Sequence, residues 1–111
     1  MSNAVLPQAG ARATDLLIDW IEGRYEEVVA DFDATMTQEL PADKLAAAWA
    51  QLIGLVGVYE RMEGEPLVRQ LGDYTVVDVP MSFESAEMKG RVAYNADGQV
   101  AGLFVLTPET L

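Results

Sequence analysis

Cysteine and histidine are both missing from this sequence of 111 residues. Without cysteine there are no disulfide bonds, thiolate nucleophiles or zinc–sulfur sites, and the redox compartment stays open. Without histidine the chain lacks the commonest general base and the commonest transition-metal ligand. The nearest carboxylate cluster, Glu60, Glu63 and Glu65, lacks the alternating acidic residues and the glycine of a calcium loop. The sequence therefore predicts neither a metal site nor a cofactor.

Basic residues are also scarce, and this scarcity excludes two classes of partner. The chain has 7 Lys and Arg against 18 Asp and Glu, which gives a formal charge of -11. Such a charge repels the phosphates of nucleic acids and the headgroups of anionic lipids. No apolar run approaches the roughly 20 residues that span a bilayer. We therefore expect no nucleic acid partner, no membrane insertion and a soluble domain, either cytoplasmic or exported.

The sequence does contain enough apolar surface for one folded domain. Half of the residues are hydrophobic, so burial of apolar side chains can offset the entropy lost on ordering the chain. Ser2-Asn3-Ala4 after Met1 resembles the remnant of a cleaved expression tag. We assign residues 1–4 to such a remnant and residues 5–111 to a single domain, and a longer natural chain stays open.

The first half of the chain has the spacing of helices. Apolar residues recur at i, i+3, i+4 and i+7 over residues 13–21, and Gly23 suits the end of that helix. The same spacing predicts a second helix over residues 25–32 and a third from Pro41 to Val56. Residues 33–40 lie between them and are interpreted as a short polar connection.

The second half changes to the alternation of β-strands. Residues 59–71 indicate one long irregular strand, interrupted near Pro66, and residues 75–84, 87–94 and 100–106 indicate three more. A tight turn at Ser85-Ala86 and a turn with a glycine bulge at residues 95–98 join these three into antiparallel hairpins. Helices followed by a meander predict an α+β domain: three N-terminal helices packed on an antiparallel sheet of about four strands.

These turns also predict which residues face each other. Phe83 is expected beside Met88, Tyr94 beside Val100, and Gly90 beside Phe104. The apolar side chains of all three strands then lie on one face, towards the helices. Their neighbours in the sequence lie on the opposite, outer face.

Motifs in both halves resemble those of domain-of-unknown-function family 3887, over roughly residues 11–108. The motifs are Phe32-Asp33-x-x-Met36, Leu40-Pro41, Leu45, Trp49, Gly57 and Arg91-Val92-x-Tyr94-x-x-Asp97-Gly98-x-Val100-Ala101-Gly102-Leu103-Phe104. That family is similar to the superfold of nuclear transport factor 2, in which a curved sheet wraps helices into a cone around a pocket. The superfold hosts polyketide cyclases, isomerases and many non-catalytic domains, so the resemblance implies a fold and no activity.

The resemblance also implies partners. Members of the family occur alone, in secreted or lipoprotein-like chains, and ahead of α/β-hydrolase domains, so an adjoining hydrolase-type domain is one candidate partner. Domains of the superfold commonly dimerise through their sheets, and a homodimer through the outer sheet face is therefore expected. The residues predicted at that interface are Val76, Lys89, Arg91, Ala93, Leu103 and Val105. A half-solvated face with scattered apolar residues would show the same pattern.

A ligand pocket is predicted inside the cone, where aromatic and methionine side chains gather. Its candidate lining is Trp20, Phe32, Met36, Trp49, Tyr59, Met81, Phe83, Tyr94 and Phe104. Gly90 and Gly102 on the inner face would leave room for a small apolar ligand. The same residues at the same spacing are typical of a hydrophobic core, and both interpretations stay open.

Asp33 is the weak catalytic candidate. In a pocket with Tyr94 or Tyr59 it could serve a small cyclase-, isomerase- or hydrolase-like enzyme as a base. The alternative is a local hydrogen bond from the next turn of backbone, a common role of aspartate. Since the inner sheet face carries no carboxylate, we expect a non-catalytic binding or accessory module. The enzyme and a purely structural dimerisation module are the alternatives.

Overall fold

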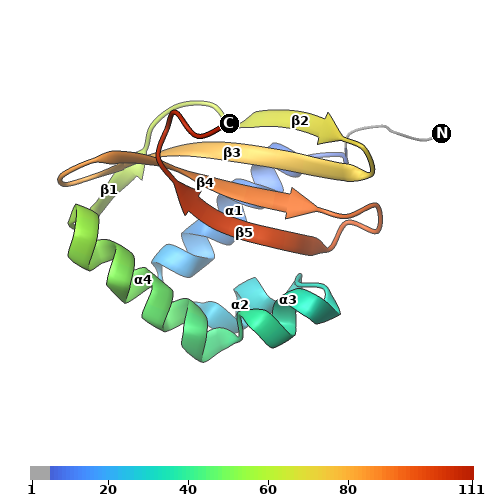
Figure 1. The fold of residues 1–111 in the computed structure, drawn as a ribbon, viewed down its shortest axis with the longest axis horizontal. Helices are drawn as coiled ribbons and strands as arrows, with labels where there is room; N and C mark the ends of the chain where they lie inside the picture. Colours follow the sequence, from blue (N-terminus) through green and yellow to red (C-terminus); the bar gives the residue numbers. More distant parts are fainter. Residues whose placement is uncertain (1–5) are drawn as a thin grey trace.

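The computed structural model describes residues 6–111 as four helices followed by five strands (Figure 1). The predicted tag remnant, residues 1–4, lies outside the described residues. The elements are α1 (Ala9–Ile21), α2 (Tyr25–Ala30), α3 (Ala34–Glu39), α4 (Ala42–Val56), β1 (Tyr59–Met62), β2 (Leu67–Leu71), β3 (Tyr74–Phe83), β4 (Glu87–Tyr94) and β5 (Val100–Leu106). The predicted α+β class is confirmed.

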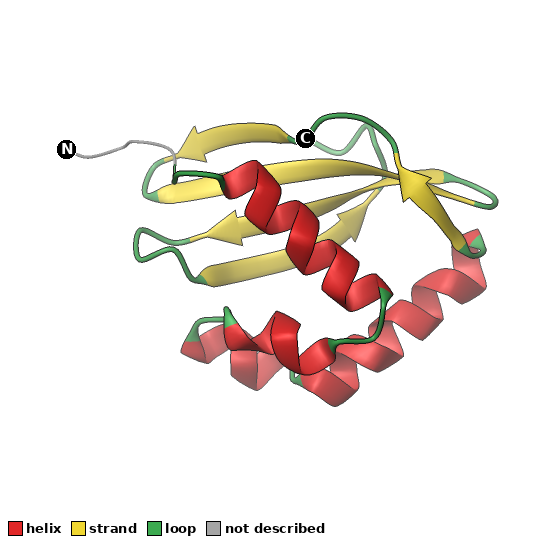
Figure 2. Cartoon of the chain, turned by 180° about the vertical axis from the view of Figure 1, so that it is seen from behind, coloured by secondary structure: helices red, strands yellow, loops and turns green. Residues whose placement is uncertain are grey.

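The strands form one antiparallel sheet in which β3 and β4 are central (Figure 1). β1 and β2 both pair with β3, β1 near its end and β2 near its beginning. The single irregular strand expected over residues 59–71 is therefore two strands in line, separated around Pro66, and β5 forms the opposite edge. Seen from behind, α1 crosses one face of the sheet, while α2, α3 and α4 lie beyond β5 (Figure 2).

The segment expected as a polar connection contains the short helix α3, which makes four helices where three were predicted. Asp33 starts this helix, because its carboxylate accepts a hydrogen bond from the Met36 amide at 2.9 Å. The backbone just before it is held on β5: Asp33 N donates to Val100 O at 2.9 Å, and Val100 N donates to Asp31 O at 2.7 Å. Tertiary contact with β5 thus stabilises a helix that its own sequence signals only weakly.

The hairpin of β3 and β4 differs from the prediction by two residues. Met81 lies opposite Met88, and the turn consists of Glu84 and Ser85. That turn is held by the end of α4, since Ser85 N donates to Val56 O at 2.8 Å. A shift of two keeps every side chain on its predicted face, so the alternation is preserved.

A β-bulge in β5 has a larger effect, because it exchanges the two faces of the strand. Tyr94 faces Val100 as predicted, but Ala93 faces Gly102, so Ala101 has no partner of its own. Beyond the bulge Leu103 points to the helices and is 7% exposed, while Phe104 points outward and is 51% exposed. The predicted inward position of Phe104, and the outward positions of Leu103 and Val105, are therefore wrong.

A chain of aromatic rings from two helices and two strands connects the core. Trp20 of α1 lies 5.4 Å from Trp49 of α4, and Trp49 lies 5.8 Å from Phe83 of β3 (ring centroids). Phe83 in turn lies 5.9 Å from Tyr59 of β1. The Trp20 indole nitrogen also donates to Leu45 O at 2.9 Å, which satisfies its polar atom inside the core.

The two glycines expected to leave room inside the cone do not do so. A Cβ atom at Gly90 would come within 2.7 Å of Leu17 Cδ1 and 3.2 Å of Met81 Sδ, so the side chain of α1 fills this space. A Cβ at Gly102 would meet Phe104 and Ala93 on the outer face, because of the bulge. Gly90 therefore serves the close approach of α1 to the sheet.

Gly90→Ala is expected to lower the free energy of unfolding by about 1–3 kcal/mol, because the new methyl group overpacks the Leu17 contact. The control is Gly54→Ala in α4, where a Cβ meets no atom within 4 Å. This second change is expected to add up to about 1 kcal/mol through helix propensity. Urea denaturation of both variants checks the contrast, and equal stability of the two would contradict it.

Candidate functional site

An open hollow of about 290 Å³ lies between α4 and the edge strand β5. It is lined by Trp20, Leu40, Ala48, Gln51, Leu52, Leu55, Leu103, Phe104 and Val105, and we call it the α4–β5 groove. Gln51 contributes an amide, and none of these residues is charged. Leu55 is 78% exposed on the rim. The groove is thus an open apolar surface with one polar end.

Only two of the predicted pocket residues, Trp20 and Phe104, line this groove. The other seven belong to the packed core or border it: Phe32, Met36, Trp49, Tyr59, Met81, Phe83 and Tyr94. The prediction missed Leu52 and Leu55 as lining residues. The signal was present in the sequence, since α4 carries apolar residues on more of its circumference than one packed face requires.

The catalytic candidate is not assembled in the described part of the chain. The Asp33 carboxylate serves the first turn of α3, as the alternative interpretation proposed. No hydrogen bond joins it to Tyr94 or Tyr59 within residues 6–111. Burial raises the pKa of Tyr94 to about 12, although the Arg12 guanidinium lies 4.6 Å from the centre of its ring. Tyr94 is therefore a neutral phenol at ordinary pH.

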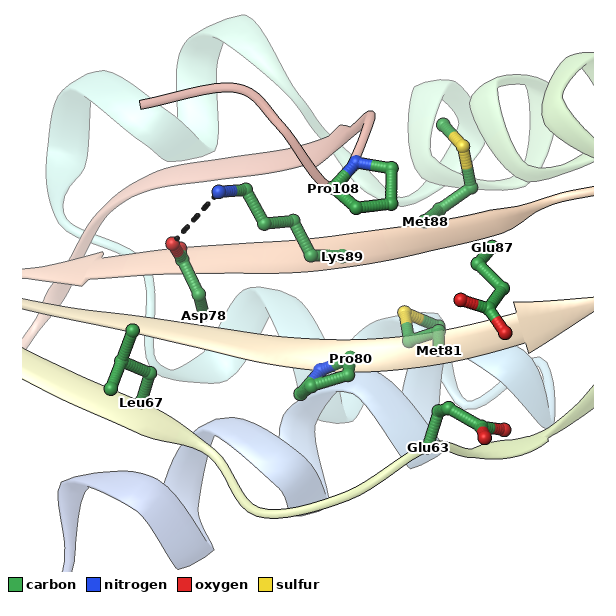
Figure 3. A pocket seen from close by; sticks show the side chains of 9 residues that line it. All are labelled: Glu63, Leu67, Asp78, Pro80, Met81, Glu87, Met88, Lys89 and Pro108. Carbon is green, nitrogen blue, oxygen red and sulfur yellow. Dashed lines mark ion pairs between the residues drawn. The ribbon is translucent and has the colours of Figure 1, made fainter.

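The densest cluster of charges lies on the outer sheet face, around Asp78 of β3. Asp78 is only 4% exposed. Arg91 of β4 binds both of its carboxylate oxygens, at 2.7 Å through Nε and 2.9 Å through Nη2. Arg69 of β2 lies at 3.1 Å and Lys89 of β4 at 3.3 Å, as Figure 3 shows for Lys89. The register of three neighbouring strands brings these four side chains together.

The pKa of Asp78 reflects two opposed effects. Burial raises it by disfavouring the charged carboxylate, and hydrogen bonds from Arg91, Arg69 and Lys89 lower it. The hydrogen bonds prevail, and the pKa falls to about 2. The sequence had placed Asp78 on the outer face, but burial of a carboxylate under three cations was not predicted. Its signal was a basic residue opposite Asp78, Arg91, with Lys89 two residues before it on the same strand face and Arg69 two residues from the position opposite Asp78 on β2.

The predicted interface residues divide between the two faces. Val76, Lys89, Arg91 and Ala93 share the outer face, whereas Leu103 and Val105 pack against the core. The outer face has a further hollow of about 310 Å³ lined by Leu71, Tyr74, Val76, Ala93, Ala101, Gly102 and Phe104. Among these, Leu71 is 53% exposed and Tyr74 is about half exposed. We call this set the outer apolar patch.

Two kinds of feature are absent from residues 6–111. No helix within residues 6–111 is both long and apolar enough to cross a membrane. Over the same residues, acidic side chains form no group of three or more that could hold a metal ion.

A family model described as a protein of unknown function (DUF3887) matches residues 13–103. That range begins within α1 and ends in β5, so it contains all of the residues that line the α4–β5 groove except Phe104 and Val105. Neither a curated protein nor a solved structure matches the chain.

Asp78→Asn is expected to lower the free energy of unfolding by roughly 3 kcal/mol near neutral pH, because three cations lose their buried counter-charge. The folded-state pKa lies below its usual value, so the ionised carboxylate stabilises the fold above about pH 4. About 2 kcal/mol is lost as the pH falls to about 2, so the difference between the two proteins narrows to about 1 kcal/mol there.

Urea denaturation over this pH range measures both effects. The control is Asp73→Asn, which removes an exposed carboxylate from the turn between β2 and β3. A constant gap between wild type and Asp78→Asn across the range would contradict the role given to the ionised carboxylate.

Proposed function

This chain belongs to the DUF3887 family of proteins of unknown function, and we propose that it is a non-catalytic binding module for a small apolar ligand. The ligand occupies the α4–β5 groove. The observation that carries the proposal is a concave surface with apolar and aromatic walls and a single amide. Small-molecule sites are commonly built in this way, with a few polar groups that orient the ligand.

The size and the rim of the groove support this function. Its volume of about 290 Å³ is close to the lower end of small-molecule sites, roughly 300 Å³. Leu55 is 78% exposed, and Phe104 is 51% exposed on the neighbouring strand, so both can lose contact with water when a ligand binds. The α+β architecture of N-terminal helices and one antiparallel sheet also fits the nuclear-transport-factor-2-like cone, in which the resemblance implies a pocket.

The distribution of titratable groups argues for binding without catalysis. None of the residues that line the groove is titratable. Asp33 caps α3, and Asp78 is held by three cations on the opposite face of the sheet. A reaction by general acid–base chemistry needs a group within hydrogen-bond reach of the ligand. No observation favours the enzyme alternative or an adjoining hydrolase-type domain.

Leu55→Asp is expected to weaken binding of Nile red, an uncharged dye, by about tenfold or more, because a carboxylate enters the apolar rim. A fluorescence titration measures the affinity. The control is Leu71→Asp, which makes the same change at a half-exposed leucine of the outer apolar patch. Leu71→Asp is expected to bind the dye as wild type does, and equal losses in both variants would refute the groove as the site.

A second candidate function, self-association, is favoured by the outer apolar patch. Leu71, Tyr74 and Phe104 expose apolar surface beside Val76 and Ala93, and none of these five side chains carries a charge. In a chain with a charge of -11, two copies approach most easily where carboxylates are absent. This interface differs from the one predicted, because Leu103 and Val105 face the core.

Leu71→Asp is expected to halve the mass of the protein in light scattering. The change places a carboxylate in the patch of each copy, and the two carboxylates repel each other across the interface. Leu55→Asp, which lies outside the patch, is expected to keep the wild-type mass. The same two variants therefore separate the functions: Leu55→Asp loses dye binding, and Leu71→Asp loses the dimer. A wild-type protein that is monomeric at all concentrations would eliminate the second candidate.

A further inference from the structure

The free edge of β5 carries backbone groups that the sheet does not use. Asn95 N donates to Gln99 O at 2.9 Å, and in an antiparallel pair every second residue of β4 before Asn95 then bonds to β5 as well. The partners of those residues on β5 are Gly102, Phe104 and Leu106. The N–H and C=O groups of Leu103 and Val105 therefore point away from β4, towards the free edge.

One position of this edge already pairs with another segment of the chain. Val100 N donates to Asp31 O at 2.7 Å, Asp33 N donates to Val100 O at 2.9 Å, and Phe32 thereby forms a parallel bridge with Val100. The pairing stops there, because the chain enters α3 directly after Asp33. Within residues 6–111, no backbone hydrogen bond from outside the sheet reaches β5 beyond Val100. The edge thus binds an extended segment at one point and keeps the same kind of groups unused further along.

The α4–β5 groove lies beside these unused groups. Leu103, Phe104 and Val105 form its wall on the strand side, and Leu52 and Leu55 belong to its wall on α4. An occupant of the groove therefore meets hydrogen-bond partners on one side and apolar side chains on the other.

The sequence of β5 lacks the residues that usually prevent pairing at a free edge. Residues 100–106 are Val-Ala-Gly-Leu-Phe-Val-Leu and include neither a charged residue nor proline. The bulge at Ala101 lies before the groove, and residues 103–106 continue in regular register with β4. An apolar edge without lysine, proline or a bulge is a template for one more strand.

A second copy of the chain does not fit this edge. The helices α2, α3 and α4 lie beyond β5 (Figure 2), so they would collide with the same helices of a second copy if two β5 strands paired. A single extended segment brings no helices with it. The occupant that matches both the backbone groups and the apolar walls is therefore a short peptide.

We propose that the ligand of the α4–β5 groove is a short extended peptide with apolar side chains, which adds a strand to β5. Its backbone pairs with the N–H and C=O groups of Leu103 and Val105, and its side chains on one face contact Leu52 and Leu55. The inference rests on the proposed binding function of the groove and names the class of its ligand. In this mode of recognition the backbone bonds provide affinity and the apolar walls select the side chains.

Amide hydrogen exchange of the complete chain, measured by NMR, tests the added strand. The probe is the peptide Lys-Val-Leu-Val-Lys, acetylated and amidated at its ends. In saturating peptide, exchange at Leu103 and Val105 is expected to slow about tenfold or more, because their N–H groups gain partners. Phe104 and Leu106 are internal controls, since their N–H groups already bond to β4, and their exchange is expected to change less. Absence of binding, or equal changes at all four amides, would overturn the proposal.

An N-methylated form of the probe is the matched ligand control. Methyl groups on its three central nitrogen atoms remove backbone donors and keep the side chains and the two positive charges. It is expected to bind about tenfold more weakly than the unmodified peptide. Equal affinities would show that the charge of -11 attracts the lysines without any backbone pairing, and would overturn the proposal.

Val105→Pro is the matched protein variant, because it removes an N–H group from the free edge without removing a bond to β4. Its control is Val105→Ala, which shortens the side chain and keeps the N–H group. The peptide is expected to bind Val105→Pro about fivefold to tenfold more weakly than Val105→Ala. Equal affinities of these two variants would contradict the added strand. If Val105→Pro fails to fold, hydrogen exchange of the wild type decides.

Nile red separates this inference from the proposed function of the groove. The peptide is expected to displace the dye from the wild type, because both occupy the same groove. Dye that binds the wild type and is lost in Leu55→Asp, but is not displaced by the peptide, would overturn the peptide ligand and leave the groove function intact. Equal loss of the dye in Leu55→Asp and Leu71→Asp would instead refute the groove itself.

Discussion

The single extra residue in β5 is the constraint on which both candidate surfaces depend. Because Ala101 has no partner on β4, the strand turns its side chains over at that point. Leu103 then completes the core and forms a wall of the α4–β5 groove, and Phe104 is left between that groove and the outer apolar patch. Without the bulge, Phe104 would enter the core, where Leu103 now fills the space. The bulge thus decides which surfaces this edge of the sheet can offer to a ligand or a partner.

The inner face of the sheet is a core, and the surfaces suited to binding lie around it. Leu17 occupies the space that Gly90 leaves, and rings from α1, α4, β3 and β1 pack on one another beyond it. Interiors packed in this way leave little room for ligands. An open groove instead remains where α4 runs past β5, because the helix presents more apolar surface than that strand can cover.

The outer face combines two kinds of surface, a charged centre and an apolar border. Its centre holds Asp78 with three basic residues, and its border holds Leu71, Tyr74 and Phe104. The strand register produces this arrangement, since Asp78 lies opposite Leu67 of β2 and Arg91 of β4. Three of the seven basic residues of the chain thus lie around one buried carboxylate on this face.

The sequence by itself determined those features of the fold that depend on residues close together in the chain. Helical spacing predicted α1, α2 and α4, and alternation predicted the faces of β3 and β4. In the predicted second turn, Asn95 Oδ1 accepts from Asp97 N and Gln99 N. Tertiary structure decided the rest: α3 is held on β5, the first turn is held by α4, and the bulge places Leu103 inside. The candidate site was accordingly predicted only in part, with Trp20 and Phe104 but without Leu52 and Leu55. Local patterns predict the alternation of side chains along a strand. Its register and its bulges are determined by contacts between segments that are distant in the sequence.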